Sequence, residues 1–166
     1  MKAEYINPFI ESVSMVFENM LDCGVELGSV SIAETPNEAP DIIGVIGLSG
    51  EARGSVVLRF PVRTALNVIS KMVDDDFKSV DSSVIDGVGE LVNIIAGNAK
   101  TKLDCNLSLS LPSVMRGDLC RLNNLKNVVW LELPFSSVLG DFSLAVNLQP
   151  SPILIKETKN ESAVGG

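Results

Sequence analysis

Residues 82–102 read SSVIDGVGELVNIIAGNAKTK, and this stretch is the strongest structural signal in the chain. At about 100° per residue, its apolar side chains share one broad helical face. That face comprises Val84, Ile85, Val88, Val92, Ile95, Ala96 and Ala99. The opposite side gathers Asp86, Glu90, Asn93, Gly97 and Lys100. The spacing predicts a long amphipathic helix packed on a core, and Ser83 with Asp86 predicts a capping box at its start.

The polar side of this helix carries a candidate site. Glu90 and Asn93 are three residues apart, so their side chains are neighbours on the surface and are expected to face solvent. Gly97 costs about 1 kcal/mol relative to alanine in a helix interior, and it removes bulk beside Asn93. Ile94 flanks the polar face. A carboxylate, an amide, a bare glycine and an isoleucine together form a candidate docking surface.

The bare pattern Glu-x-x-Asn is common, and an exposed helix face is its more frequent explanation. It occurs at Glu4/Asn7, Glu34/Asn37, Glu90/Asn93 and Glu157/Asn160. The first pair is expected to straddle a helix start, the second to lie in a turn and the fourth in the tail. The third pair alone is predicted to lie within a long amphipathic helix.

The rest of the chain is expected to form one α+β domain over residues 1–149, with a flexible tail over 150–166. Asn7 and Pro8 predict the start of a first helix that Gly24 closes. A second helix is predicted over 62–73, and Ser49-Gly50-Glu51 is predicted to be a hairpin turn. Strands are predicted near 25–33, 42–48, 54–60, 107–115, 127–133 and 140–146. The order indicates a repeat of helix plus three strands, forming a mainly antiparallel six-stranded sheet covered by helices.

Composition excludes several classes of function. A net charge of −8 argues against nucleic-acid binding, and no apolar run reaches the roughly 20 residues of a membrane span. With no secretory signal and three cysteines that lack metal-type spacing, a reduced cytoplasmic protein without a metal site of its own is expected. The chain contains no histidine, which excludes Ser-His-Asp and Cys-His nucleophiles.

The segment from Gly89 to Lys100, GELVNIIAGNAK, resembles the signature helix of the CheX/CheC family of response-regulator phosphatases. The resemblance extends over about residues 3–149 and implies that family's fold. It also implies an enzyme that hydrolyses the aspartyl phosphate of a CheY-like receiver domain, in chemotaxis or another two-component pathway. The phosphorylated receiver would supply the phosphate, a bound Mg²⁺ and a lysine, so the chain needs no cofactor of its own.

The resemblance also implies roles for single residues. Glu90 would pair with the partner's lysine and Asn93 would orient a water in line with the phosphorus. The neighbouring partner-binding residues would be Asp86, Ile94, Gly97 and Lys100. In CheC-like relatives a second pair lies on the first helix, where this chain has Glu11 and Ser14. One active centre is therefore expected, as in CheX-like members, and these members imply a homodimer formed through sheet edges.

Two alternatives remain open from the sequence. The chain could be a non-catalytic module that docks on a receiver domain or on a flagellar switch or signalling complex, because related folds serve as structural parts. It could also be a small-molecule enzyme that binds Mg²⁺ through residues 74–76, three consecutive aspartates. A solvated loop is the more frequent explanation of such an acidic run.

Overall fold

The computed structural model describes residues 3–33, 41–117 and 128–151. The helices are α1 (Ala3–Leu21), α2 (Val62–Val73) and α3 (Ser82–Lys102). The strands are β1 (Glu26–Leu27), β2 (Ser31–Ala33), β3 (Asp41–Gly50), β4 (Ala52–Pro61), β5 (Leu107–Leu109), β6 (Ser113–Arg116), β7 (Trp130–Ser136) and β8 (Phe142–Pro150). The predicted tail falls largely outside these residues; β8 itself includes Pro150, and Ser151 is buried.

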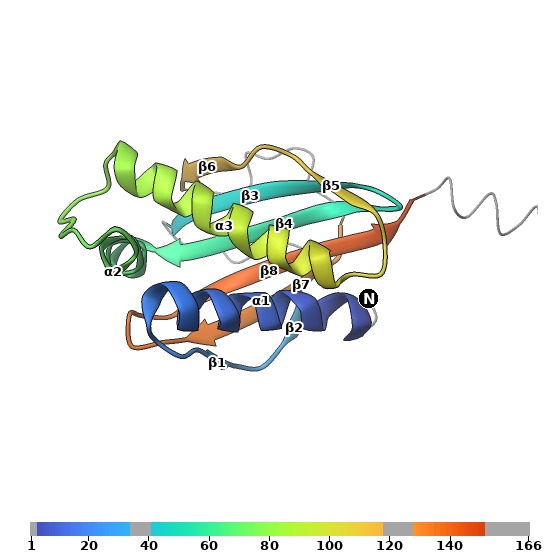
Figure 1. Cartoon of the computed structure of the whole chain (residues 1–166), viewed down its shortest axis with the longest axis horizontal. Helices are drawn as coiled ribbons and strands as arrows, with labels where there is room; N and C mark the ends of the chain where they lie inside the picture. The colour runs from blue at the N-terminus through green and yellow to red at the C-terminus, as the bar shows by residue number, and fades with distance from the viewer. Residues whose placement is uncertain (1–2, 34–40, 118–127, 152–166) are drawn as a thin grey trace, which may run out of the picture.

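The strands form a single sheet in the order β1-β7-β8-β4-β3-β5, and the described strand pairs are antiparallel. β1 and β2 both pair with β7, and β5 and β6 both pair with β3. β1 and β2 stand where one strand was predicted near 25–33, and β5 and β6 where one was predicted near 107–115, so each of these two predicted strands is interrupted once. The first strand of each half pairs with the second strand of the other half, which confirms the pseudo-symmetric repeat (Figure 1).

The helices cover one face of the sheet, with α1 and α3 lying side by side along it and α2 at one end (Figure 1). Neighbouring residues on a strand point to opposite faces. Ile42 therefore packs in the main core under the helices, whereas Ile43 joins a small cluster on the other face with Val57, Trp130 and Ala145. Within the part of the chain described, no helix has the length and apolar character of a membrane span.

The first helix differs from its prediction at both ends. α1 already includes Ala3, so Pro8 lies inside it and Asn7 is not its cap. A proline there removes one backbone hydrogen bond, but Tyr5 and Ile6 pack against the core and stabilise the additional turn. The helix ends at Leu21, followed by Asp22 in a left-handed conformation (φ 49°), and Gly24 is not the closing residue.

The third helix has the predicted bounds but a different cap. The side chain of Asp81 accepts a hydrogen bond from the backbone N–H of Val84 at 3.0 Å, so the capping box of Ser83 and Asp86 is wrong. Two further predictions are confirmed: α2 spans 62–73, and the β3–β4 hairpin turns at Gly50 with φ 130°.

The described cysteines are free thiols. Cys23 and Cys105 form no disulfide, and each is half-buried. Burial raises the pKa of both thiols, so neither is an activated nucleophile.

Alanine substitutions at two glycines of α3 are expected to change the free energy of unfolding in opposite directions. A Cβ at Gly87 would lie 2.8 Å from Ile69 Cγ2 of α2, whereas a Cβ at Gly97 would meet nothing within 4 Å. Gly87→Ala is therefore expected to lower the free energy of unfolding by about 1–3 kcal/mol through overpacking. Gly97→Ala, the matched control, should raise it by about 0.5–1 kcal/mol. Urea denaturation measures both values, and an equal gain in both variants would contradict the close α2–α3 packing.

Candidate functional site

The middle of α3 holds Glu90 and Asn93 in fixed positions. Its buried side seats Val88 and Val92 against β3 at Gly44, where an added Cβ would lie 3.1 Å from Val92 Cγ1. The missing side chain at Gly44 therefore lets the helix lie close to the sheet. Because the buried side of α3 is packed in the core, Glu90 and Asn93 point outward and are exposed on a rigid element.

The other predicted site residues lie on the same helix. Asp86 and Lys100 are exposed, whereas Ile94 and Gly97 are half-buried. The space around Gly97 is open to a partner group, since an added Cβ there would have no neighbour within 4 Å. These four residues therefore share the outward side of α3 with Glu90 and Asn93. We call the surface formed by all six residues the α3 face. The roles of these residues remain predictions.

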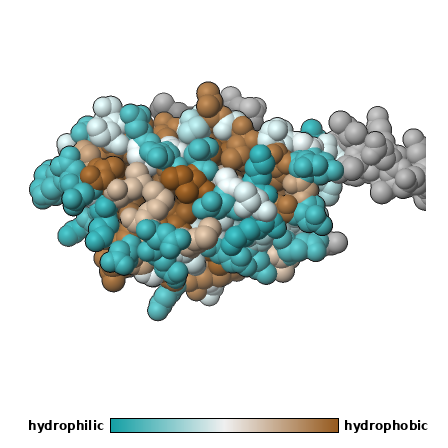
Figure 2. All heavy atoms as spheres, in the orientation of Figure 1, coloured by the Kyte–Doolittle hydropathy of each residue, from teal (hydrophilic) through white to brown (hydrophobic). Residues whose placement is uncertain are grey.

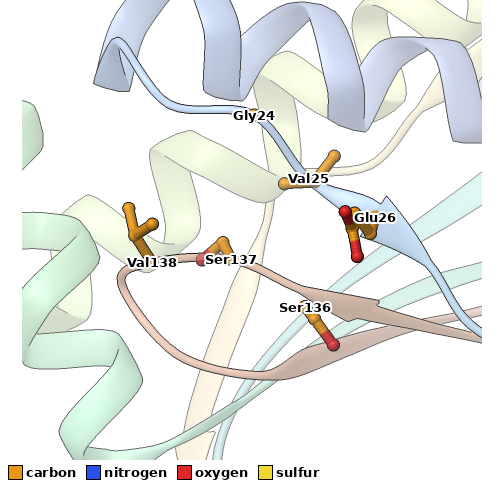
Figure 3. A pocket seen from close by; sticks show the side chains of 6 residues that line it. All are labelled: Gly24, Val25, Glu26, Ser136, Ser137 and Val138. Carbon is orange, nitrogen blue, oxygen red and sulfur yellow. The ribbon is translucent and has the colours of Figure 1, made fainter.

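Two open cavities of the described structure lie away from Glu90 and Asn93. One open cavity of about 500 Å³ is lined by Gly24, Val25, Glu26, Ser136, Ser137 and Val138, between the end of α1 and the β7–β8 turn (Figure 3). A second, of about 700 Å³, borders α2 and residues 74–78. The α3 face is not part of either cavity, so it is suited to a macromolecular partner and not to an enclosed small ligand.

The acidic run after α2 does not converge on one point. Asp74 adopts a left-handed conformation (φ 55°) that ends α2, and the side chain of Asp76 pairs with Lys78 at 2.8 Å. Within the described ranges, no group of three or more acidic, cysteine or histidine side chains could hold a metal ion. This arrangement gives the magnesium-enzyme alternative no geometric support.

The position on α1 that corresponds to the second centre of CheC-like relatives is occupied by an interhelical contact. The Glu11 carboxylate accepts a hydrogen bond from Lys102 Nζ at 2.8 Å, which ties α1 to the end of α3. Ser14 is half-buried. Sequence reasoning missed this ion pair, because the two residues are 91 positions apart.

One prediction about the motif is wrong. Because α1 includes Ala3, Glu4 and Asn7 lie within a helix and both are exposed, so Glu90/Asn93 is not the sole helical copy of the pattern. The earlier start of α1 was hidden by Pro8, which normally marks a first helical turn. The two copies nevertheless differ in setting, since Glu90 and Asn93 lie near the middle of α3 and Glu4 and Asn7 lie in the first turns of α1.

The fold is an antiparallel sheet of two interleaved halves covered by α1 and α3, and α3 exposes an acid–amide pair. This combination defines a CheC-like class of protein. A crystal structure of a CheC-like superfamily protein from Shewanella sp. PV-4 superimposes with a TM-score of 0.78 and 27% identity, covering 90% of this chain and 99% of that one. The family model described as Chemotaxis phosphatase CheX matches residues 42–136, more than half of the chain. The chain therefore belongs to the CheX family.

Two further relatives fall in the same family. The CheY-P phosphatase CheX of Thermotoga maritima is 28% identical over 140 residues, which cover 82% of this chain and 89% of that protein. The crystal structure of the CheX-CheY-BeF3-Mg complex from Borrelia burgdorferi matches with a TM-score of 0.74 and 26% identity, covering 89% of this chain and 99% of that chain. The family match includes Glu90 and Asn93 and excludes Glu4 and Asn7.

Proposed function

We propose that this member of the chemotaxis phosphatase family hydrolyses the aspartyl phosphate of a phosphorylated CheY-like receiver domain, with Glu90 and Asn93 as its working residues. The observation that carries the proposal is the exposure of both side chains on the middle of α3, inside the region that matches the family. The complex of the Borrelia burgdorferi relative with CheY, BeF3 and Mg supports this class of partner.

Asn93 would contribute to the reaction by orienting a water molecule. Its amide can both donate and accept a hydrogen bond, so it can aim a water oxygen at the phosphorus. That oxygen forms the new P–O bond while the bond to the aspartate oxygen breaks, which yields a free carboxylate and inorganic phosphate. Phosphoryl transfer depends mainly on positioning and charge stabilisation, so no histidine is required. Mg²⁺ held by the receiver would stabilise charge on the phosphoryl oxygens.

The rest of the α3 face would hold the receiver in register. Glu90 offers a carboxylate for a cationic side chain of the partner, and a lysine is the group that the family resemblance implies. Asp86 and Lys100 offer charges of opposite sign on the same side of the helix, while Gly97 leaves room for the approach. Ile94 is half-buried and adds a small apolar border.

Replacing Glu90 by alanine is expected to weaken docking. Loss of a hydrogen bond to a charged group costs about 1.5–3 kcal/mol, which corresponds to roughly 10–100-fold in affinity. Titration of a beryllofluoride-activated receiver would measure this loss, and turnover at low substrate should fall by a similar factor. Glu18→Ala removes an exposed acid of α1 and serves as the control. Equal affinities for the two variants would refute the docking role of Glu90.

The function itself is tested with the wild-type chain. Receiver domains from the source organism are phosphorylated with Mg²⁺ present, and phosphate loss is followed with and without the protein. Faster loss from one receiver supports the phosphatase. Binding to a receiver without faster loss supports the alternative, a non-catalytic module of a receiver or flagellar switch complex, which the fold can equally form.

The proposal includes a cytoplasmic location, where receiver domains of two-component pathways act, and a homodimer formed through a sheet edge. The β1–β2 edge exposes Leu27, Val30 and Ile32, the last of them 72% exposed. Unpaired edge strands with apolar side chains readily pair with a second chain. Sedimentation velocity should give the mass of two chains, and Ile32→Lys should shift it to one; a single-chain mass for the wild type would contradict the dimer.

A further inference from the structure

The connection between β5 and β6 is held firmly against β3. The backbone N–H of Ser110 donates to the carbonyl of Gly47 at 2.9 Å, and the backbone N–H of Gly47 donates to Ser110 Oγ at 2.9 Å. Ser110 Oγ also donates to the carbonyl of Leu111 at 3.0 Å. The backbone that carries Leu111 is therefore fixed by the sheet.

This connection lies directly beside α3, at the turn that precedes Asn93. A Cβ at Gly89 would lie 3.2 Å from Val114 Cγ2 and 3.7 Å from Pro112 Cγ. Gly89 and Asn93 are four residues apart, so they share one edge of the helix. The absence of a side chain at Gly89 thus brings the segment next to the α3 face.

Leu111 projects from this segment into solvent. It is 89% exposed, the highest value among the large hydrophobic residues described. Single exposed apolar side chains are common and need no explanation by themselves. The combination of a fixed backbone, full exposure and a position beside the α3 face is different, because a segment that is already ordered loses little backbone entropy when its side chain is bound.

We propose that Leu111 is an apolar anchor for the receiver domain whose aspartyl phosphate reaches Asn93. This inference rests on the proposed function and adds a residue that would set affinity for the partner. Figure 2 shows hydrophobic surface over α3 and at the edge formed by the β5–β6 connection, separated by polar side chains. Apart from Glu90, the charged residues of the α3 face, Asp86 and Lys100, are solvated and add modest affinity. Contact between Leu111 and the receiver buries apolar surface beside Asn93. The receiver must therefore offer an apolar patch beside its phosphorylation site.

The test compares Leu111→Ser with Val138→Ser. Val138 is 88% exposed in the β7–β8 turn, across the sheet from β5, so it matches Leu111 in exposure and chemistry but not in position. Affinity for receivers activated with beryllofluoride and Mg²⁺ is measured by titration, in the wild-type and Asn93→Ala backgrounds. Leu111→Ser is expected to raise Kd about tenfold in both backgrounds and Val138→Ser to leave it unchanged. Turnover should show a raised KM with unchanged kcat.

The outcomes separate this inference from the proposed function. If a receiver binds but does not lose phosphate faster, the phosphatase fails, while a tenfold effect of Leu111→Ser on Kd still supports the anchor. If turnover is normal and Leu111→Ser binds like the wild type, the anchor is wrong and the phosphatase stands. Equal weakening by Val138→Ser also overturns the anchor, since a general surface effect would then explain the loss. If no activated receiver binds, both are overturned.

Discussion

Replacing Asn93 by alanine is expected to slow dephosphorylation of the receiver about 100-fold or more while the fold remains intact. Misplacing a reacting group by about 1 Å can cost about 100-fold in rate, and this variant removes the amide that would position the water. The side chain is exposed, and alanine is a better helix former than asparagine. The variant should therefore unfold no more easily than the wild type.

Single-turnover measurement at saturating protein separates the chemical step from docking. Asn93→Ala should lower the maximal rate and leave the affinity for the beryllofluoride-activated receiver nearly unchanged. Asn7→Ala is the matched control, because Asn7 has the same Glu-x-x-Asn spacing, is exposed and lies on α1 outside the family match. Wild-type turnover in Asn93→Ala, or an equal loss in Asn7→Ala, would contradict the assignment.

Replacing Arg59 by methionine is expected to lower the free energy of unfolding by about 3–5 kcal/mol at neutral pH. Arg59 Nη1 lies 3.6 Å from Glu132 Oε1, and their side chains are 7% and 14% exposed. Removing the guanidinium leaves the Glu132 carboxylate buried without this opposite charge. Arg53, exposed on the same strand, supplies the control: Arg53→Met should change the stability by less than about 0.5 kcal/mol.

The loss in Arg59→Met should depend on pH. Desolvation raises the pKa of Glu132, whereas Arg59 and a hydrogen bond from Ser143 lower it, so removal of Arg59 raises it further. A raised pKa in the folded state means that the native protein binds the proton more tightly than the unfolded chain. Stability is then greatest below the unfolded carboxyl pKa and is lost as pH rises through the folded pKa.

Urea denaturation at several pH values measures this dependence. The difference between Arg59→Met and the wild type should shrink from pH 7 to about pH 5. The double variant Arg59→Met/Glu132→Leu should recover part of the stability, because it removes the buried charge altogether. A loss that is independent of pH would show that the cost arises from packing and not from the unpaired carboxylate.

Much of the fold could be predicted because the periodicity of the buried residues is strong. The bounds of α2 and α3 and the hairpin at Gly50 agree with the predictions. Errors occur at helix ends, where several local signals compete, and in the two predicted strands that the structure divides. Asp81 and Ser83 can each act as a cap, and tertiary packing decides between them, since Val84 must enter the core. Pro8 predicted a helix start, but the burial of neighbouring side chains extended α1 by another turn.

Residue spacing was enough to predict which side of α3 is buried, and so to place Glu90 and Asn93 on the exposed side. The absence of histidine was enough to exclude histidine-based chemistry. These properties depend on residue type and on spacings within one element. Long-range packing, in contrast, placed Leu111 beside α3, paired Glu11 with Lys102 and set Arg59 against Glu132. Such neighbours are distant in sequence, and they meet because strand order and register bring separate elements together, which local periodicity cannot specify.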